Sequence, residues 1–124
     1  GHEMAGVFSN DDKLSKDFIT AATAEGEGAW RMPLAPAYDK MLKSRIADMK
    51  NVGTRAAGSI TAGQFLQRFV KDDMPWAHLD IAGVASITSE SAFAPKGATG
   101  WGVRALNRLI ADHYEIKGED APGE

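Results

Sequence analysis

Residues 76–83, with the sequence WAHLDIAG, constrain the fold more than any other part of this chain. They predict a short buried strand over 76–82 that ends in a glycine turn, with the apolar Leu79 and Ile81 on one face. A buried strand needs hydrogen-bonded neighbours on both edges. Only residues 5–8 offer a second strand, and a sheet of two strands leaves its edges unpaired. We therefore expect this segment to belong to a larger α/β sheet.

Apolar residues at helical spacing predict four helices, which cover residues 11–24, 36–47, 61–71 and 101–115. Asn10 is the expected N-cap of the first helix, because its side chain can accept a bond from a free amide of the first turn. Thr61 and Gln64 resemble a capping box at the start of the third helix. The other segments are expected to be a connector over 30–34, loops over 48–59 and 86–100, and a frayed tail over 117–124.

Composition excludes several classes of protein. The net charge is −3, from 14 basic and 17 acidic residues, which gives no electrostatic basis for binding nucleic acid or an anionic membrane. The chain contains 0 cysteines, so disulfides and thiolate metal sites are excluded, and a reducing compartment is favoured. No apolar run approaches the roughly 20 residues that a membrane-spanning helix needs. We expect neither nucleic acid nor a membrane as a partner.

His78 and Asp80 are the titratable residues of most interest, because residues two apart project from the same face of a strand. They could form part of a metal site, or a base with its orienting carboxylate. They could equally be a hydrogen-bonded polar pair that holds loops in place at the end of the strand. A metal site needs three or four ligands, and the absence of an evident third favours the polar pair.

Other candidate sites have structural explanations. The acidic pairs at 11–12, 72–73 and 119–120 lie at helix ends or in the tail, where they act as capping or surface charges. No HExxH, GxSxG or Walker-type motif is present, and Ser59 and Ser86 have no evident triad partners. In the glycine-containing loop 51–59, Arg55 could bind an anion or could tie the loop down.

Several short stretches, taken in order, resemble the leucyl aminopeptidase family, in particular the C-terminal part of its catalytic domain. The matching stretches are residues 5–10, 30–34, 47–51, 57–58 followed by 61–62 and 65–66, then 76–83 and 96–100. The resemblance implies an α/β fold, in which this chain forms the C-terminal portion of a mixed-sheet catalytic domain flanked by helices. It also implies that residues 1–124 are a C-terminal fragment of such a domain.

The resemblance further implies a cytoplasmic metalloaminopeptidase that removes leucine-like N-terminal residues from peptides. That family is a homohexamer and uses two divalent ions, zinc or manganese, whose ligands lie on motifs resembling Asn-Thr-Asp-Ala-Glu-Gly-Arg. No such motif occurs in this chain, so no metal ligand and no catalytic residue is assigned to it. We expect the chain to be inactive without the missing upstream half of the protein. The alternative is a non-catalytic fragment or a domain that supports assembly.

One family element does have counterparts in this sequence. In the family, the stretch after the strand lines the pocket for the side chain of the substrate's first residue. The resemblance therefore places Ala82, Gly83 and Ala85 at the wall of this substrate-binding pocket. Small residues leave room for a leucine-sized side chain. Family members often have a larger residue, such as methionine, where this chain has Ala85, so we expect a roomier pocket, with loop 86–100 beside it.

Overall fold

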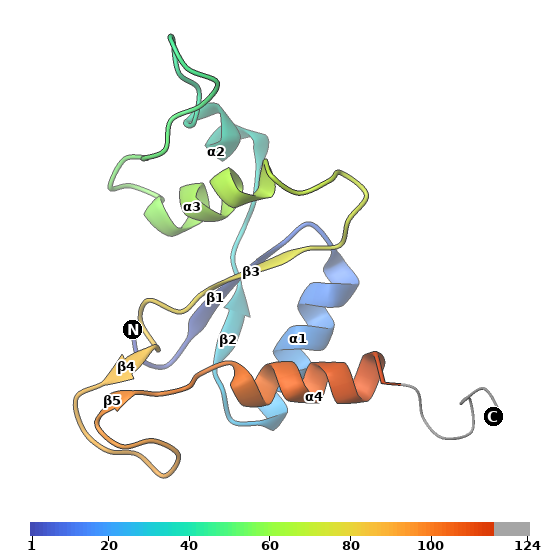
Figure 1. Ribbon diagram of the computed structural model, residues 1–124, viewed down its shortest axis with the longest axis vertical. Helices are drawn as coiled ribbons and strands as arrows, with labels where there is room; N and C mark the ends of the chain where they lie inside the picture. Colours follow the sequence, from blue (N-terminus) through green and yellow to red (C-terminus); the bar gives the residue numbers. More distant parts are fainter. Residues whose placement is uncertain (116–124) are drawn as a thin grey trace, which may run out of the picture.

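The computed structural model describes residues 1–115, and a three-stranded sheet of order β2-β1-β3 lies at its centre (Figure 1). The strands are β1 (Ala5–Ser9), β2 (Ala29–Arg31) and β3 (Ala77–Asp80). β1 pairs in parallel with β2 and antiparallel with β3, so the sheet is mixed, as expected. The strands predicted at 5–8 and 76–82 are both present, although β3 is shorter than predicted.

Two long helices, α1 (Asp12–Ala24) and α4 (Val103–His113), pack against each other, and α1 also packs against β1 and β2 of the sheet. The core between them consists of Val7, Phe18, Ala21, Ala22, Ala29, Ala105 and Leu109. Phe8 follows Val7 along β1 and therefore points to the opposite face. There it meets α3 (Gly58–Gln67) at Gly63, where an added Cβ would lie 3.1 Å from the Phe8 ring.

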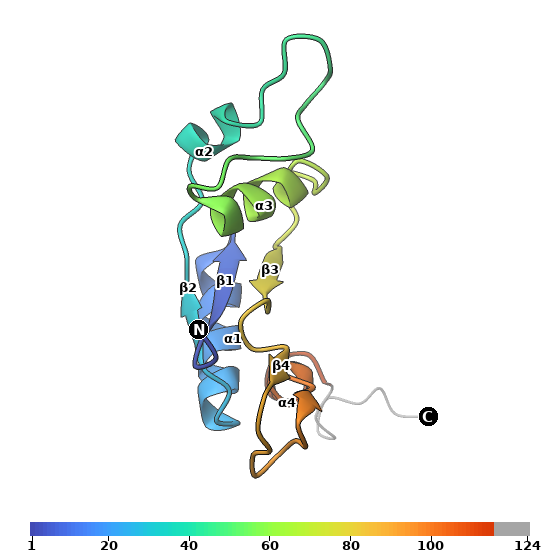
Figure 2. The same ribbon diagram turned by 90° about the vertical axis from the view of Figure 1, so that its left-hand side faces the viewer.

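The remaining elements lie at the two ends of the sheet. The helices α2 (Pro36–Lys40) and α3 lie beyond one end, and the hairpin of β4 (Ser86–Ile87) and β5 (Gly97–Ala98) lies toward the other end (Figure 2). Within residues 1–115, the outer edges of β2 and β3 have no further strand partner. None of the described helices is long and apolar enough to cross a membrane.

The second predicted helix, 36–47, is wrong in its length. α2 ends at Lys40, and the chain then turns. The Ser44 hydroxyl accepts bonds from the amides of Ile46 and Ala47, so these amides are satisfied locally rather than by a helix. Ile46 is 99% exposed, which shows that it does not continue an apolar helix face.

The capping box predicted at Thr61 is also wrong, because α3 begins three residues earlier, at Gly58. Thr61 lies inside the helix, where its hydroxyl donates to the carbonyls of Ala57 and Gly58. The predicted end at residue 71 is likewise too late, since α3 ends at Gln67. A serine or threonine side chain can cap a helix or bond back to the preceding turn, and the sequence pattern does not distinguish the two.

At the start of α1, Asp11 is the N-cap instead of the predicted Asn10. The Asp11 carboxylate accepts a 2.6 Å hydrogen bond from the Leu14 amide. Asn10 instead joins α1 to the entry of β3, donating to the Met74 carbonyl (2.9 Å) and accepting from the Trp76 amide (2.8 Å). Neighbouring polar residues compete for the cap, and here the tertiary contact of Asn10 decides between them.

Three further predicted segments differ from the structure. The connector predicted over 30–34 contains the end of strand β2, and the loop predicted over 86–100 contains β4 and β5. These strands are two or three residues long, too short for a periodic pattern to reveal. The last helix occupies Val103–His113 within the predicted 101–115. The predicted frayed tail, 117–124, lies outside the described residues.

Ala57, which precedes α3, has a left-handed backbone with φ of 55°. This conformation costs a residue with a Cβ about 1–2 kcal/mol, whereas glycine adopts it freely. Replacing Ala57 by glycine is therefore expected to raise the free energy of unfolding by about 0.5–1 kcal/mol, after allowing for the extra freedom of the unfolded chain. Urea unfolding measures this change. The matched control is Ala62→Gly inside α3, which should lower the free energy of unfolding by about 1 kcal/mol. An equal decrease in both variants would contradict backbone strain at Ala57.

Candidate functional site

The predicted pocket wall lies in a turn, residues 80–85, that follows β3 directly. The Ile81 carbonyl accepts hydrogen bonds from the amides of Val84 (3.0 Å) and Ala85 (2.9 Å), which closes the turn. Ala82 is exposed, whereas Gly83 and Ala85 are half-buried. The structure thus brings the three predicted pocket residues together in one compact segment, and their role in substrate binding stays a prediction.

Asp80 ties this turn to β3 and α3. One carboxylate oxygen accepts a 3.1 Å bond from the Ala82 amide, and the other accepts a bond from the Ser59 hydroxyl in the first turn of α3. The Ser59 hydrogen bond lowers the pKa of Asp80 most, and the Ala82 amide and the nearby His78 lower it further, against the effect of burial. An ionised Asp80 therefore holds two segments in place, but its partners are the Ser59 hydroxyl and the Ala82 amide. Among residues 1–115 the predicted hydrogen-bonded pair of His78 and Asp80 is not formed, because the His78 ring stacks on Phe8 and Trp76 instead.

His78 takes part in an aromatic stack. Its ring centroid lies 5.8 Å from that of Phe8 and 6.3 Å from that of Trp76, and the planes of His78 and Trp76 are 9° apart. Among residues 1–115, there is no group of three or more His, Cys, Asp or Glu side chains that could hold a metal ion. The described part of the chain therefore does not support the alternative in which His78 and Asp80 begin a metal site.

The N-terminal residues hold the turn from a second side. The ring Nδ1 of His2 lies 2.9 Å from the Gly83 carbonyl oxygen, within hydrogen-bond distance. The backbone of Gly1 approaches so closely that an added Cβ at Gly83 would collide with the Gly1 carbonyl. A side chain at Gly83 would therefore require the N-terminal segment to move. His2 is exposed, and sequence reasoning gave no sign of its contact 81 residues away.

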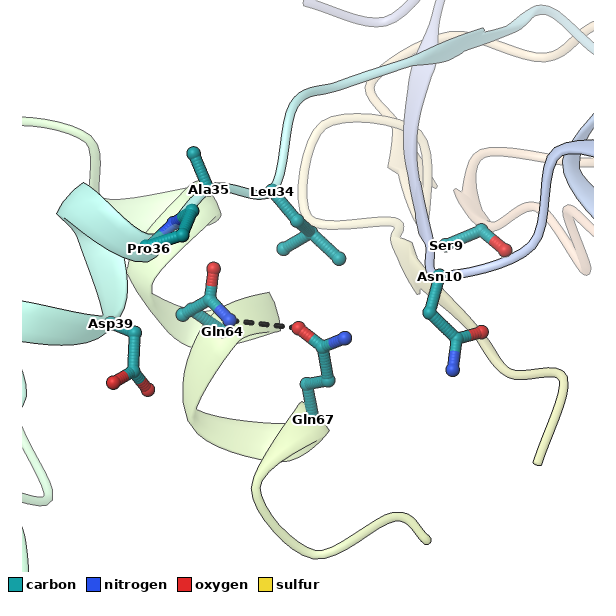
Figure 3. Close-up of a pocket in the computed structure, with 8 residues that line it drawn as sticks. All are labelled: Ser9, Asn10, Leu34, Ala35, Pro36, Asp39, Gln64 and Gln67. Atoms are coloured by element: carbon teal, nitrogen blue, oxygen red, sulfur yellow. Dashed lines mark hydrogen bonds between the residues drawn. The ribbon is translucent and has the colours of Figure 1, made fainter. Parts of the chain in front are cut away.

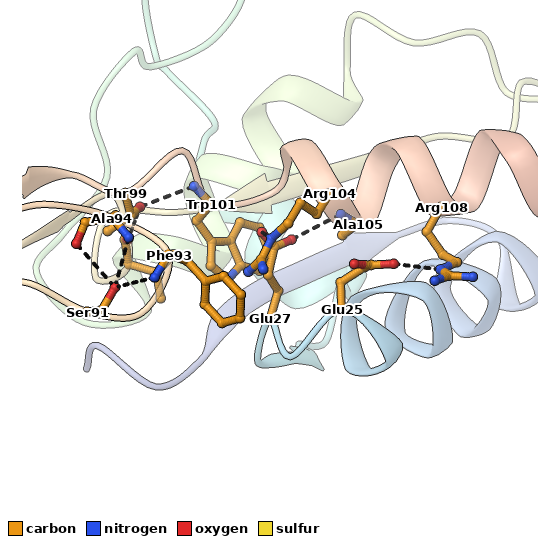
Figure 4. A network of polar contacts seen from close by, with 11 residues as sticks. Glu25, Glu27, Ser91, Phe93, Ala94, Thr99, Trp101, Arg104, Ala105 and Arg108 are labelled. Atoms are coloured by element: carbon orange, nitrogen blue, oxygen red, sulfur yellow. Dashed lines mark hydrogen bonds and ion pairs between the residues drawn. The ribbon is translucent and has the colours of Figure 1, made fainter.

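Thr99, which follows β5, holds the end of the turn. Its hydroxyl donates to the Val84 carbonyl (2.7 Å), and its amide donates to the Ala85 carbonyl (3.0 Å). The same hydroxyl accepts a 3.1 Å bond from the Trp101 amide, just before α4 (Figure 4). Thr99 therefore joins the turn to the C-terminal helix.

A buried carboxylate organises the neighbouring loop. Glu27 is 4% exposed, and its side chain accepts a 3.1 Å bond from the Ala105 amide in the first turn of α4 (Figure 4). It substitutes for the helix cap, because the N-cap residue Gly102 has no side chain. Arg104 lies 3.5 Å from Glu27 and 3.9 Å above the Phe93 ring, so it links α4 to the loop between β4 and β5.

Two of the cavities in the described part of the chain matter for the predicted sites, and both lie away from this turn. The larger, about 550 Å³, lies between the end of β1 and the helices α2 and α3, and is lined by Ser9, Asn10, Leu34, Ala35, Pro36, Asp39, Gln64 and Gln67 (Figure 3). The other, about 430 Å³, lies between loop 51–54 and α3. Neither cavity includes Ala82 or Ala85. Arg55 is exposed, and an anion site in its loop stays a prediction.

Residues 1–107 match the catalytic domain of the cytosol aminopeptidase family, and the chain therefore belongs to this family. A probable cytosol aminopeptidase of Dinoroseobacter shibae is 74% identical over 115 residues, which are 93% of this chain and 24% of that protein. A probable cytosol aminopeptidase of Cereibacter sphaeroides is 64% identical over the same shares of the two chains. The chain spans about a quarter of the length of the curated relatives that it matches.

Solved structures carry the same fold. A tomato leucine aminopeptidase mutant superposes with a TM-score of 0.83 at 38% identity, covering 90% of this chain and 21% of that one. The cytosol aminopeptidase of Coxiella burnetii gives a TM-score of 0.84 at 36% identity and covers 93% of this chain and 25% of its own. A bottromycin maturation enzyme in complex with Mn superposes with a TM-score of 0.85 at 36% identity. The match covers 90% of this chain and 25% of that enzyme. The mixed α/β architecture is therefore that of the leucine aminopeptidases, as the resemblance implied.

Proposed function

We propose that this chain is part of a metal-dependent aminopeptidase that releases leucine-like N-terminal residues from peptides. The observation that carries this proposal is the match of residues 1–107 to the catalytic domain of the cytosol aminopeptidase family. Since the chain spans about a quarter of its relatives' length, we propose that it is the C-terminal part of a longer polypeptide of similar length, here called the full-length protein.

Within the full-length protein, the chain would supply the wall of the pocket that receives the side chain of the substrate's first residue. The compact turn 80–85 supports this role, because its backbone is closed by hydrogen bonds and presents the small side chains of Ala82 and Ala85. Small wall residues leave space for a branched aliphatic side chain. The exposed position of Ala82 leaves it free to face a substrate.

The two divalent ions, manganese or zinc, would be held by residues outside this chain. One structural neighbour is described as a complex with Mn, which supports the metal class. Residues 1–115 do not fit such a site, since they contain no cluster of three potential ligands. No chemical step through the metal ions is therefore assigned to this chain.

We also propose a cytoplasmic location and a homohexameric assembly for the full-length protein. The location is supported by the cytosol aminopeptidase names of the relatives and by the absence of cysteine from the sequence. The homohexamer rests on the family resemblance alone.

The test compares the full-length protein with the isolated 124-residue chain in hydrolysis of leucine p-nitroanilide with added manganese. The full-length protein is expected to turn over the substrate and to lose this activity in EDTA, whereas the isolated chain should show none. Intact mass under denaturing conditions is the control that each sample is a single species. Turnover by the pure chain would contradict the placement of the ligands outside it. A metal-loaded full-length protein without turnover would instead favour a role in assembly.

A further inference from the structure

Every residue of the turn from Ala82 to Ala85 has a backbone group held by a distant or preceding residue. The Ala82 amide is bound by Asp80, the Gly83 carbonyl lies against His2, and the carbonyls of Val84 and Ala85 are bound by Thr99. The partners come from the end of β3, the N-terminus and the end of β5. A turn needs one or two internal hydrogen bonds to close, and this one has those as well.

From this arrangement we propose that Asp80 and Thr99 are positioning residues that determine side-chain selectivity by fixing the backbone of the turn. Neither residue needs to touch the substrate. The inference rests on the proposed function, because it takes Ala82 and Ala85 as the pocket wall. It goes further by assigning the shape of that wall to two residues outside it.

Thr99 fixes the far end of the turn through two of its own groups. The hydroxyl makes the shorter bond, 2.7 Å to the Val84 carbonyl, and also receives the Trp101 amide. Because Trp101 packs against the core between α1 and α4, the position of the hydroxyl is tied to that core. Val84 is itself buried, at 3% exposure, and this burial also holds the turn against the rest of the molecule.

Asp80 fixes the near end. Its carboxylate is shared between the Ala82 amide and the Ser59 hydroxyl, so its orientation depends on α3 rather than on β3 alone. A carboxylate bound by two donors has one preferred orientation. The position of the Ala82 amide depends on that orientation, because the amide is hydrogen-bonded to the carboxylate. The two ends of the pocket wall are thus held by two independent parts of the fold.

Selectivity is sensitive to such positioning because one methylene more or less in an apolar pocket changes relative rates by about 10-fold or more. If the pocket wall shifts by less than the width of a methylene group, a different side chain becomes the one that fits best. A change in wall position therefore alters the ratio of rates between substrates, whereas a general loss of stability lowers all rates together.

The test uses the full-length protein with the variants Thr99→Val and Thr99→Ser. Valine keeps the shape of threonine but lacks the hydroxyl, while serine keeps the hydroxyl. We measure kcat/KM for the p-nitroanilides of leucine, phenylalanine and alanine. The Thr99→Val variant is expected to change the leucine-to-phenylalanine ratio by roughly 10-fold, and Thr99→Ser to restore it to within about 2-fold of the unaltered protein.

A second variant, Ser59→Ala, frees one oxygen of Asp80 and removes no group from the turn itself. It is expected to change the leucine-to-phenylalanine ratio of kcat/KM by at least about 2-fold. This variant tests the positioning role if Thr99→Val does not fold. Equal loss of kcat/KM for all substrates, with an unchanged ratio, overturns the proposal. Suppose that Ala82→Trp changes the kinetics on leucine p-nitroanilide, while the leucine-to-phenylalanine ratio stays constant in the Thr99 and Ser59 variants. The positioning role is then wrong, and the placement of Ala82 in the pocket wall is retained. If Ala82→Trp has no effect, the pocket itself fails.

Discussion

Replacing Phe18 by alanine is expected to lower the free energy of unfolding of this chain by about 3–5 kcal/mol. Phe18 is 2% exposed and lies in the core between α1, α4 and the sheet. Its ring centroid lies 6.3 Å from that of Trp101, so truncation removes an aromatic contact as well as apolar burial. The cavity would open where the two helices meet, and few neighbouring side chains are large enough to fill it.

Urea unfolding followed by circular dichroism measures this loss. The matched control is Phe69→Ala, since Phe69 is 68% exposed and, within residues 1–115, stacks only with Phe65. It should cost about 1 kcal/mol or less. Near-equal losses in the two variants would show that the packing of α1 on α4 does not carry the stability of the fold.

Replacing Ala82 by tryptophan in the full-length protein is expected to raise KM for leucyl substrates by at least about 10-fold. Ala82 is exposed on a turn whose backbone is held from three directions, so the turn has little freedom to move away from a larger side chain. The indole would therefore occupy the space that the leucine side chain requires. Steady-state kinetics on leucine p-nitroanilide measure the change.

The control for this variant is Ala37→Trp, because Ala37 is an exposed alanine on α2, at the opposite end of the sheet (Figure 1). It adds the same side chain far from the proposed pocket and should leave KM unchanged. Kinetics that are also unchanged for Ala82→Trp would remove Ala82 from the pocket wall. Raised KM in both variants would point to a general effect of added tryptophan.

The long periodic segments of this chain were predictable from the sequence. The helices α1 and α4 and the strands β1 and β3 lie where the sequence placed them. The buried residues of α1 follow the helical period. The two strands do not alternate, since β1 is buried at consecutive positions and β3 is half-buried throughout, so they were recognised as short apolar runs. The short strands β2, β4 and β5 were missed, since two or three residues carry no measurable period. The length of α2 was overestimated because the local hydrogen bonds of Ser44 are not visible in the apolar pattern.

The sequence by itself determined the family resemblance, the α/β class that the resemblance implies, and the small residues of the proposed pocket wall, because these depend on residue identities and on the order of short stretches along the chain. Only the tertiary structure decided what holds that wall. Ser59 meets Asp80 across 21 residues, Thr99 meets Val84 across 15, and His2 meets Gly83 across 81. Serine, threonine and histidine can donate to many partners, so no local pattern identifies these pairs. They are established when the sheet and the helices pack and bring distant parts of the chain within hydrogen-bond distance.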